Sequence, residues 1–175
     1  MARTFISIDI PENIKKEIKK IQDSLLDFKG KKTEPENLHL TLKFLGEIND
    51  KKVESVKEKL KSIRFNKFET EAVSLGVFSE NFIRIVWIHL INCEELQKEI
   101  DNKLSEVGFA QEDRFMGHLT IARIKHTENK AEFLENIKRI KLPKIKFSVD
   151  KFRLKSSILT SEGPVYKTLG EYKLT

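Results

Sequence analysis

Alternating apolar and polar residues occur in short stretches along the whole chain, and each stretch predicts a β-strand. Longer stretches with apolar residues three or four positions apart lie between them and predict amphipathic helices. The expected strands cover residues 3–10, 38–45, 68–78, 82–90, 115–124, 145–154 and 165–174. The expected helices lie between Pro11 and Gly30, after Asn49, between Asn92 and Gly108, and between Thr127 and Pro143, with Asn49 and Thr127 as expected N-caps.

The order of these elements repeats. Strand–helix–strand–helix–strand occurs twice, with one extra strand at the end, which predicts an internal duplication with halves of approximately 1–79 and 80–175. No linker rich in proline, glycine or serine separates the halves, so we expect a single domain over residues 1–175. The expected fold is α+β: two pseudo-symmetric lobes of antiparallel sheet, with helices packed on the outer faces and a central active-site groove.

Two of the expected strands carry the same polar pattern. One contains Leu38-His39-Leu40-Thr41-Leu42, and the other contains His118-Leu119-Thr120-Ile121, 79 residues further along. Successive side chains of a strand point to opposite faces, so the histidine and the threonine of each motif share one face. Two of the four histidines in the chain therefore occupy the same setting.

This pattern suits acid–base chemistry on a phosphodiester. A neutral imidazole accepts a proton and an imidazolium donates one near neutral pH, and a hydroxyl on the same face can donate a hydrogen bond to an oxyanion. Two such motifs facing one another supply the base, the acid and the donors that in-line displacement at phosphorus requires. A lone histidine on a strand is more often structural, and zinc sites use three or four protein ligands, so the matched pair indicates catalysis without a metal or cofactor.

Basic and aromatic residues near the motifs are candidate substrate-binding residues. Arg123 could neutralise a phosphate, but strict alternation puts it on the face opposite His118, so a bulge or a strand end is needed. Lys43 has the same alternation as His39 and is the second basic candidate. The candidates for base stacking are Phe5, Trp87 and Tyr166. The alternative for Phe5 and Trp87 is that their rings belong to the hydrophobic core.

Composition narrows the possible function classes. Of 175 residues, 39% are hydrophobic and 34% are charged, which is typical of a soluble globular protein. No apolar stretch is long enough to span a membrane, and the N-terminus lacks a signal-peptide pattern. Cys93 is the only cysteine, so an internal disulfide is impossible and a cytoplasmic location is expected. The net charge of +6 favours anionic partners, with nucleic acid first among them.

The two motifs, with several further segments, resemble the two-histidine (2H) phosphoesterase superfamily. More narrowly, the chain is similar to the RNA 2′,3′-cyclic phosphodiesterases, a family also described as 2′-5′ RNA ligases. The matching segments extend over almost the whole chain and cover residues 3–11, 36–46, 85–87, 118–123 and 163–166. Many relatives carry proline immediately before the second histidine, where this chain has Gly117.

The resemblance implies metal-independent hydrolysis of the 2′,3′-cyclic phosphate ends of RNA to 2′-phosphomonoesters. On this basis His39 would be the general acid and His118 the general base, although the sequence leaves the order of the two open. Thr41 and Thr120 would hold the nonbridging phosphate oxygens, assisted by Arg123. The expected substrates are RNA ends, including those of tRNA fragments, or nucleoside cyclic phosphates, and the protein is expected to act as a monomer.

Two other functions remain open on the sequence. Members of this family can also join RNA ends through a 2′-5′ bond, so ligation of tRNA halves is one alternative. The other is a non-catalytic module that binds RNA or nucleotides in the same groove, although such a module has no need of an acid–base pair. Water is in large excess over an RNA hydroxyl as the nucleophile, so we expect hydrolysis.

Overall fold

Nine strands form one antiparallel sheet in the part of the chain that the computed structural model describes, residues 2–175. They are β1 (Ala2–Asp9), β2 (Lys29–Lys32), β3 (His39–Ile48), β4 (Phe68–Val77), β5 (Ile85–Ile91), β6 (His118–His126), β7 (Lys146–Val149), β8 (Lys151–Thr160) and β9 (Gly163–Lys173). Their order along the sheet is β7-β4-β5-β6-β3-β1-β8-β9, and β2 pairs with β6. The two motif strands, β3 and β6, are therefore neighbours near the middle of the sheet.

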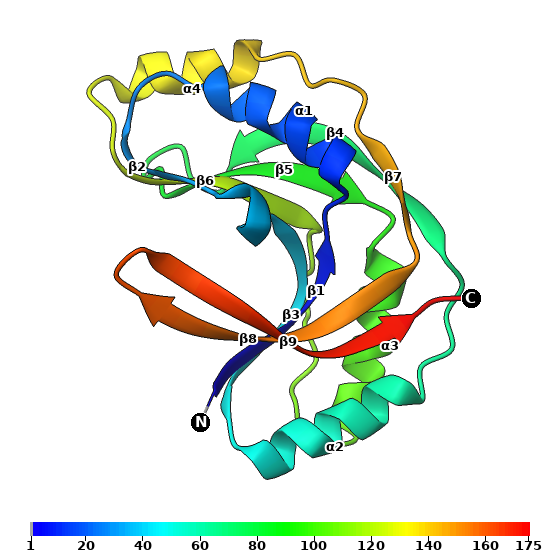
Figure 1. Cartoon of the computed structure of the whole chain (residues 1–175). Helices are drawn as coiled ribbons and strands as arrows, with labels where there is room; N and C mark the ends of the chain where they lie inside the picture. Colours follow the sequence, from blue (N-terminus) through cyan, green and yellow to red (C-terminus); the bar gives the residue numbers. More distant parts are fainter. Residues whose placement is uncertain (1) are drawn as a thin grey trace.

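The sheet is strongly curled, and helices cover its convex face (Figure 1). α1 (Glu12–Asp23) lies against β6 and α4 (Lys130–Arg139) against β4, whereas α2 (Asp50–Lys61) lies against β9 and α3 (Glu94–Ser105) against β3. Each helix buries one apolar face, as Ile14, Ile18 and Ile21 do in α1. The core thus lies between helices and sheet, and the concave face carries the half-buried and exposed side chains of β3, β5 and β6. This confirms the expected α+β fold with two lobes and outer helices.

Elements from the two halves of the sequence are interleaved in space. β4, from the first half, pairs with β5 and β7 of the second half, and β8, from the second half, pairs with β1. Likewise, α1 lies against β6 and α3 lies against β3. One continuous sheet therefore joins both halves, while the internal duplication stays a prediction.

The single strand expected at residues 145–154 is wrong, because the chain forms two strands there. β7 pairs with β4 at one edge of the sheet, whereas β8 pairs with β1 in the other lobe. Asp150 lies between the two strands, and its carbonyl accepts a hydrogen bond from the Leu174 amide at 2.7 Å. Alternation predicts that a segment is extended, but it does not predict which strand each part will pair with.

β2 is a strand that the hydrophobic pattern does not predict. All four of its residues are exposed, so the segment has no apolar alternation. Backbone pairing with β6 holds it in place, with Lys31 opposite Arg123. β2 adds three lysines beside the motif strand.

The helix ends follow local side-chain chemistry. The Asn49 side chain caps α2 as expected, accepting a hydrogen bond from the Lys52 amide at 2.9 Å. At α4 the expected cap, Thr127, is wrong: the Asn129 side chain accepts from the Glu132 amide at 3.0 Å. None of the helices in the described part of the chain is long and apolar enough to cross a membrane.

Candidate active site

The sheet register brings the two motifs together. β3 and β6 are antiparallel, and Leu40 lies opposite Leu119. This register places His39 on the side of Thr120 and Thr41 on the side of His118. Both leucines are 1% exposed and belong to the core, so the histidines and threonines face the concave side, where they are half-buried. Each histidine therefore has the threonine of the other motif as its cross-strand neighbour.

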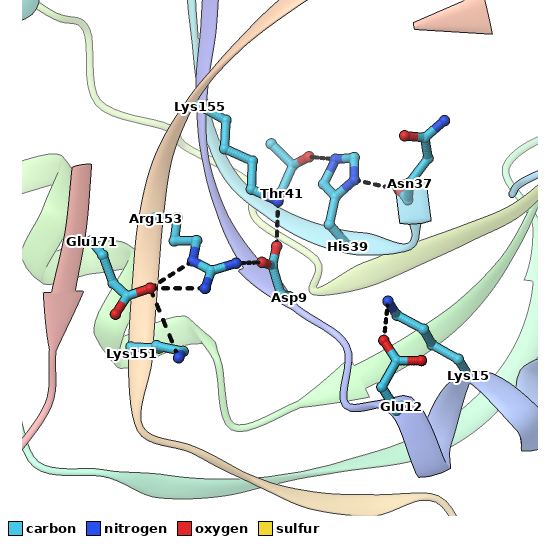
Figure 2. A network of polar contacts seen from close by, with 10 residues as sticks. All are labelled: Asp9, Glu12, Lys15, Asn37, His39, Thr41, Lys151, Arg153, Lys155 and Glu171. Carbon is cyan, nitrogen blue, oxygen red and sulfur yellow. Dashed lines mark hydrogen bonds and ion pairs between the residues drawn. The ribbon is translucent and has the colours of Figure 1, made fainter. Parts of the chain in front are cut away.

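Both imidazoles are anchored in the same way. The Nδ1 atom of His39 lies 2.7 Å from the carbonyl oxygen of Asn37, and that of His118 lies 3.0 Å from the carbonyl oxygen of Met116. A carbonyl only accepts hydrogen bonds, so each Nδ1 carries the proton and each Nε2 is the atom that exchanges one. For His39, Nε2 accepts a hydrogen bond from the Thr41 hydroxyl at 3.0 Å (Figure 2).

An aromatic ring stands edge-on to each imidazole. Tyr166 contacts His39 with a centroid separation of 5.2 Å, and Phe78 contacts His118 with a separation of 5.1 Å. Phe78 is 58% exposed and directly follows β4, a strand for which the sequence pattern predicts no functional residue. Phe5 also packs on His39, at 5.0 Å, but it is only 3% exposed and so has almost no surface to offer a base.

Burial is the main influence on the protonation of His39. The pKa of His39 is lowered from 6.5 to about 4: burial and the charges of Lys155 and Arg123 lower it, and they outweigh the hydrogen bond to the Asn37 carbonyl and the charge of Asp9, which raise it. At neutral pH the imidazole of the ligand-free protein is therefore uncharged. Its Nε2 atom is then an acceptor, as its contact with Thr41 requires.

A network of charged side chains lies beside His39 (Figure 2). Asp9, which lies opposite His39 in the β1–β3 pairing, accepts hydrogen bonds from Lys155 and Arg153 of β8. Burial alone would raise the pKa of Asp9, but these two cations hold it below its ordinary value. Arg153 also donates to Glu171 at 2.9 Å. Sequence reasoning did not find Asp9 or Lys155, because they meet His39 only through strand pairing.

A β-bulge in β6 brings Arg123 to the site. Thr120 pairs with Trp87 and Ala122 pairs with Val86, so Ile121 is left out of the pairing. The extra residue reverses the alternation, and Arg123 is exposed on the same face as His118. Burial is the main influence on both neighbouring rings and lowers the pKa of His39 while it raises that of Tyr166; the charge of Arg123 acts to lower both, as expected of a guanidinium close to the two rings. The bulge that the sequence analysis required is therefore present.

The corresponding bulge in β3 has the opposite consequence for Lys43. Thr41 pairs with Ser7 and Lys43 pairs with Ile6, so Leu42 is left out. Lys43 consequently turns into the core, where it is 4% exposed and donates to Asp101 at 2.5 Å and to the Ala110 carbonyl at 2.7 Å. The prediction that Lys43 shares a face with His39 and binds substrate is wrong.

Gly117, which precedes the second histidine, lies where β5 approaches closely. A β-carbon at this position would stand 2.4 Å from the carbonyl oxygen of Leu90, nearer than atoms can approach without a shift of the backbone. The Gly117 carbonyl in turn accepts a hydrogen bond from the Leu90 amide at 2.8 Å. Glycine thus lets β5 and β6 come together immediately before His118, and β5 places His89 opposite that histidine.

The described residues contain no group of three or more histidine, cysteine, aspartate or glutamate side chains placed to hold a metal ion.

Trp87, the remaining candidate for stacking, is half-buried beside Thr120, and its ring packs on Gly76 and Phe78. The site that the fold assembles on the concave face therefore consists of two imidazoles, two hydroxyls, one guanidinium and an aromatic border.

Comparison with known proteins shows the family to which the chain belongs. The sequence profile of LigT like phosphoesterases matches residues 8–87 and 91–166. An RNA 2′,3′-cyclic phosphodiesterase of Methanocaldococcus jannaschii is 40% identical, over 97% of this chain and 99% of its own length. A protein of the same name from Thermotoga maritima is 38% identical, over 97% of this chain and 94% of its own length.

Solved structures show the same fold at lower sequence identity. TT0787 of Thermus thermophilus superposes with a TM-score of 0.84 at 23% identity, covering 98% of this chain and 97% of that protein. LigT of E. coli, in a complex with 3′-AMP, superposes with a TM-score of 0.80 at 23% identity and covers 99% of this chain and 98% of that one. The profile match and the full-length relatives together show that the chain belongs to the LigT-like phosphoesterase family.

Proposed function

We propose that this protein hydrolyses the 2′,3′-cyclic phosphate ends of RNA to 2′-phosphomonoesters without a metal ion, acting as a monomer in the cytoplasm. The observation that carries the proposal is the placement of two imidazoles, each anchored at Nδ1, on neighbouring strands and on one face. The names of the full-length relatives supply the substrate class.

In the proposed reaction, water attacks phosphorus on the side opposite O3′ of the ribose. His118 takes a proton from the water, and His39 gives a proton to O3′ as the bond between phosphorus and O3′ breaks. The product carries the phosphate on O2′ and a free 3′-hydroxyl. Thr41 and Thr120 donate hydrogen bonds to the nonbridging oxygens, and Arg123 balances their negative charge.

A chelator assay with product identification tests the proposal. Nucleoside 2′,3′-cyclic phosphates are incubated with the protein and excess EDTA, and the products are separated by chromatography. We expect the 2′-phosphomonoester at an undiminished rate. A 3′-phosphate product, or activity that disappears with the chelator, contradicts the mechanism. Adding RNA with a 5′-hydroxyl and measuring joined product on a gel compares ligation with hydrolysis in the same reaction.

If His39 is the general acid, we expect the protein to take up a proton when it binds a phosphate ligand. An imidazole with a pKa of about 4 is uncharged at pH 6, so it needs a bound phosphate anion to raise its pKa before it can donate. A 2′-nucleotide should therefore bind with uptake of a proton, and its affinity should rise as the pH falls from neutral towards 4. Calorimetric titration at pH 6 in buffers of different ionisation enthalpy measures this uptake.

The phosphate group of the ligand also titrates near pH 6, so a variant must isolate the contribution of the protein. His39→Gln keeps a polar side chain but removes the titrating group. Proton uptake should be smaller in this variant than in the wild type at the same pH. Equal uptake in both proteins would show that His39 stays uncharged in the complex and would reverse the assignment of acid and base.

A further inference from the structure

Positively charged residues continue along β6 beyond the active site. The exposed face of this strand carries His118 and Thr120 and, after the bulge, Arg123 and Lys125. Both cations are exposed, while Ile124 between them is buried. One strand thus connects the catalytic histidine to a basic region at its own far end.

Exposed aromatic residues accompany these cations. The loop between β4 and β5 begins with Phe78, which contacts His118, and continues to Phe82, which is 63% exposed. The guanidinium of Arg84 lies over the Phe82 ring, 4.0 Å from its centroid, and donates to the Lys125 carbonyl at 3.2 Å. The loop is therefore fixed against the end of β6.

A cavity of about 200 Å³ opens at this place. Its lining includes Phe82 and three basic residues, Arg84, Lys125 and Lys130. The ammonium group of Lys130 donates to the Asn81 carbonyl at 3.1 Å, which keeps the first turn of α4 beside the loop. We call Phe82, Arg84, Lys125 and Lys130 the Phe82 surface.

Aromatic rings interspersed with cations are the combination that binds single-stranded nucleic acid, because bases stack on the rings and phosphates pair with the cations. Two other exposed apolar groups lie near the site. Phe44 of β3 is 69% exposed and packs on Phe5 with a centroid separation of 6.3 Å, but the antiparallel register puts it on the opposite side of the motifs from Lys125. The tip of the β8–β9 hairpin is aliphatic, with Ile158, Leu159 and Val165 at 64%, 77% and 56% exposed, and offers no ring for a base. The Phe82 surface, which combines an exposed ring with cations, is therefore favoured for RNA.

We propose that the Phe82 surface binds the nucleotides on the 5′ side of the cyclic phosphate, so that the preferred substrate is an RNA oligonucleotide and not a single nucleoside cyclic phosphate. This inference rests on the proposed hydrolysis and adds the place where the rest of the RNA lies. A base stacks on the exposed face of Phe82, and the flanking phosphates pair with Arg84, Lys125 and Lys130.

The test compares two substrates, a nucleoside 2′,3′-cyclic phosphate and a short oligoribonucleotide with the same 3′-terminal nucleotide and cyclic phosphate. For Phe82→Ala and Arg84→Ala, the ratio of kcat/KM for the oligonucleotide to kcat/KM for the nucleoside substrate should fall about tenfold. Leu159→Ala, at a side chain of similar exposure on the hairpin, is the matched control and should leave the ratio unchanged. An unchanged ratio in both surface variants, or a fall only in Leu159→Ala, overturns the proposal.

Salt dependence and direct binding supply further readouts. The slope of log affinity against log salt for the oligonucleotide should decrease by about 0.7 for each phosphate contact removed with Arg84, Lys125 or Lys130. Fluorescence anisotropy with an oligonucleotide ending in a 2′-phosphate measures this slope without turnover. If the wild type hydrolyses neither substrate, the proposed function fails, and the anisotropy of the variants still decides whether RNA binds the Phe82 surface. An unchanged slope in all three charge variants overturns the assignment of the phosphate contacts.

Discussion

Turnover of a nucleoside 2′,3′-cyclic phosphate should fall by about 10²- to 10⁴-fold when either His39 or His118 is replaced by glutamine. Each imidazole has its Nδ1 atom fixed to a backbone carbonyl, so only Nε2 can exchange a proton, and a glutamine amide cannot. Because the acid and the base act in one displacement, the double variant should lose little more than the worse single variant. Initial rates of hydrolysis in the presence of EDTA should be measured for the two single variants and the double variant and compared with the wild type.

His126→Gln is the matched control for these variants. His126 is exposed at the end of β6, on the same strand as His118 but outside the motif, where it pairs with Lys29 of β2 and lines the cavity beside Phe82. Its substitution should leave hydrolysis of the nucleoside substrate unchanged. Circular dichroism and urea unfolding check that every variant keeps its fold. A His39 or His118 variant that is folded and retains more than about a tenth of the activity would contradict two-histidine catalysis.

Stability should fall by about 3–5 kcal/mol when Lys43 is replaced by alanine, because the Asp101 carboxylate is then buried without its cation. The side chains of the pair are 3% and 5% exposed, respectively. Asp101 also accepts from the Gln97 amide at 3.0 Å and the Glu112 backbone at 2.7 Å, but neither bond supplies a positive charge. Urea unfolding at pH 7 measures the loss.

Two comparisons separate this effect from a general loss of surface charge. Lys61→Ala breaks an exposed pair with Glu58 and should cost at most about 1 kcal/mol. The double variant Lys43→Met with Asp101→Leu should recover most of the stability, because no unpaired charge remains in the core. The account of Lys43 is wrong if Lys43→Ala is no more destabilising than Lys61→Ala.

The contribution of the Lys43–Asp101 pair to stability depends on pH through the titration of the Asp101 carboxyl group. Burial alone would raise the pKa of Asp101, but hydrogen bonds from Lys43, the Glu112 backbone and Gln97 hold it below its ordinary value. A lowered pKa in the folded state stabilises the protein above the ordinary pKa of about 3.9, and this contribution is lost as the pH falls through the lower value. The pair therefore contributes fully at neutral pH.

The sequence was sufficient to predict the centre of the site. His39 and Thr41, like His118 and Thr120, share a face because alternation holds over these short segments. Alternation fails immediately after each threonine, where Leu42 and Ile121 are bulged. Nothing in the residue pattern marks a bulge, so alternation alone puts Lys43 at the site and Arg123 on the opposite face, and only the family resemblance kept Arg123 among the expected site residues.

Other parts of the site depend on pairing between distant strands. Asp9, Lys155 and Phe78 come from β1, β8 and the end of β4, and each reaches a histidine only after the sheet has formed. The break at Asp150 also depends on distant pairing. The segment before it, β7, pairs with β4, whereas the segment after it, β8, pairs with β1. Local periodicity predicts the elements, whereas their partners are set by the packing of the whole chain.

The central claim is that both imidazoles act on one phosphorus atom. A crystal structure of the protein with a 2′-nucleotide product tests it most directly. We predict that the Nε2 atoms of His39 and His118 both lie within hydrogen-bonding distance of the bound phosphate group, with the hydroxyls of Thr41 and Thr120 on its nonbridging oxygens. A phosphate held by only one of the two rings, or bound elsewhere on the sheet, would contradict the account.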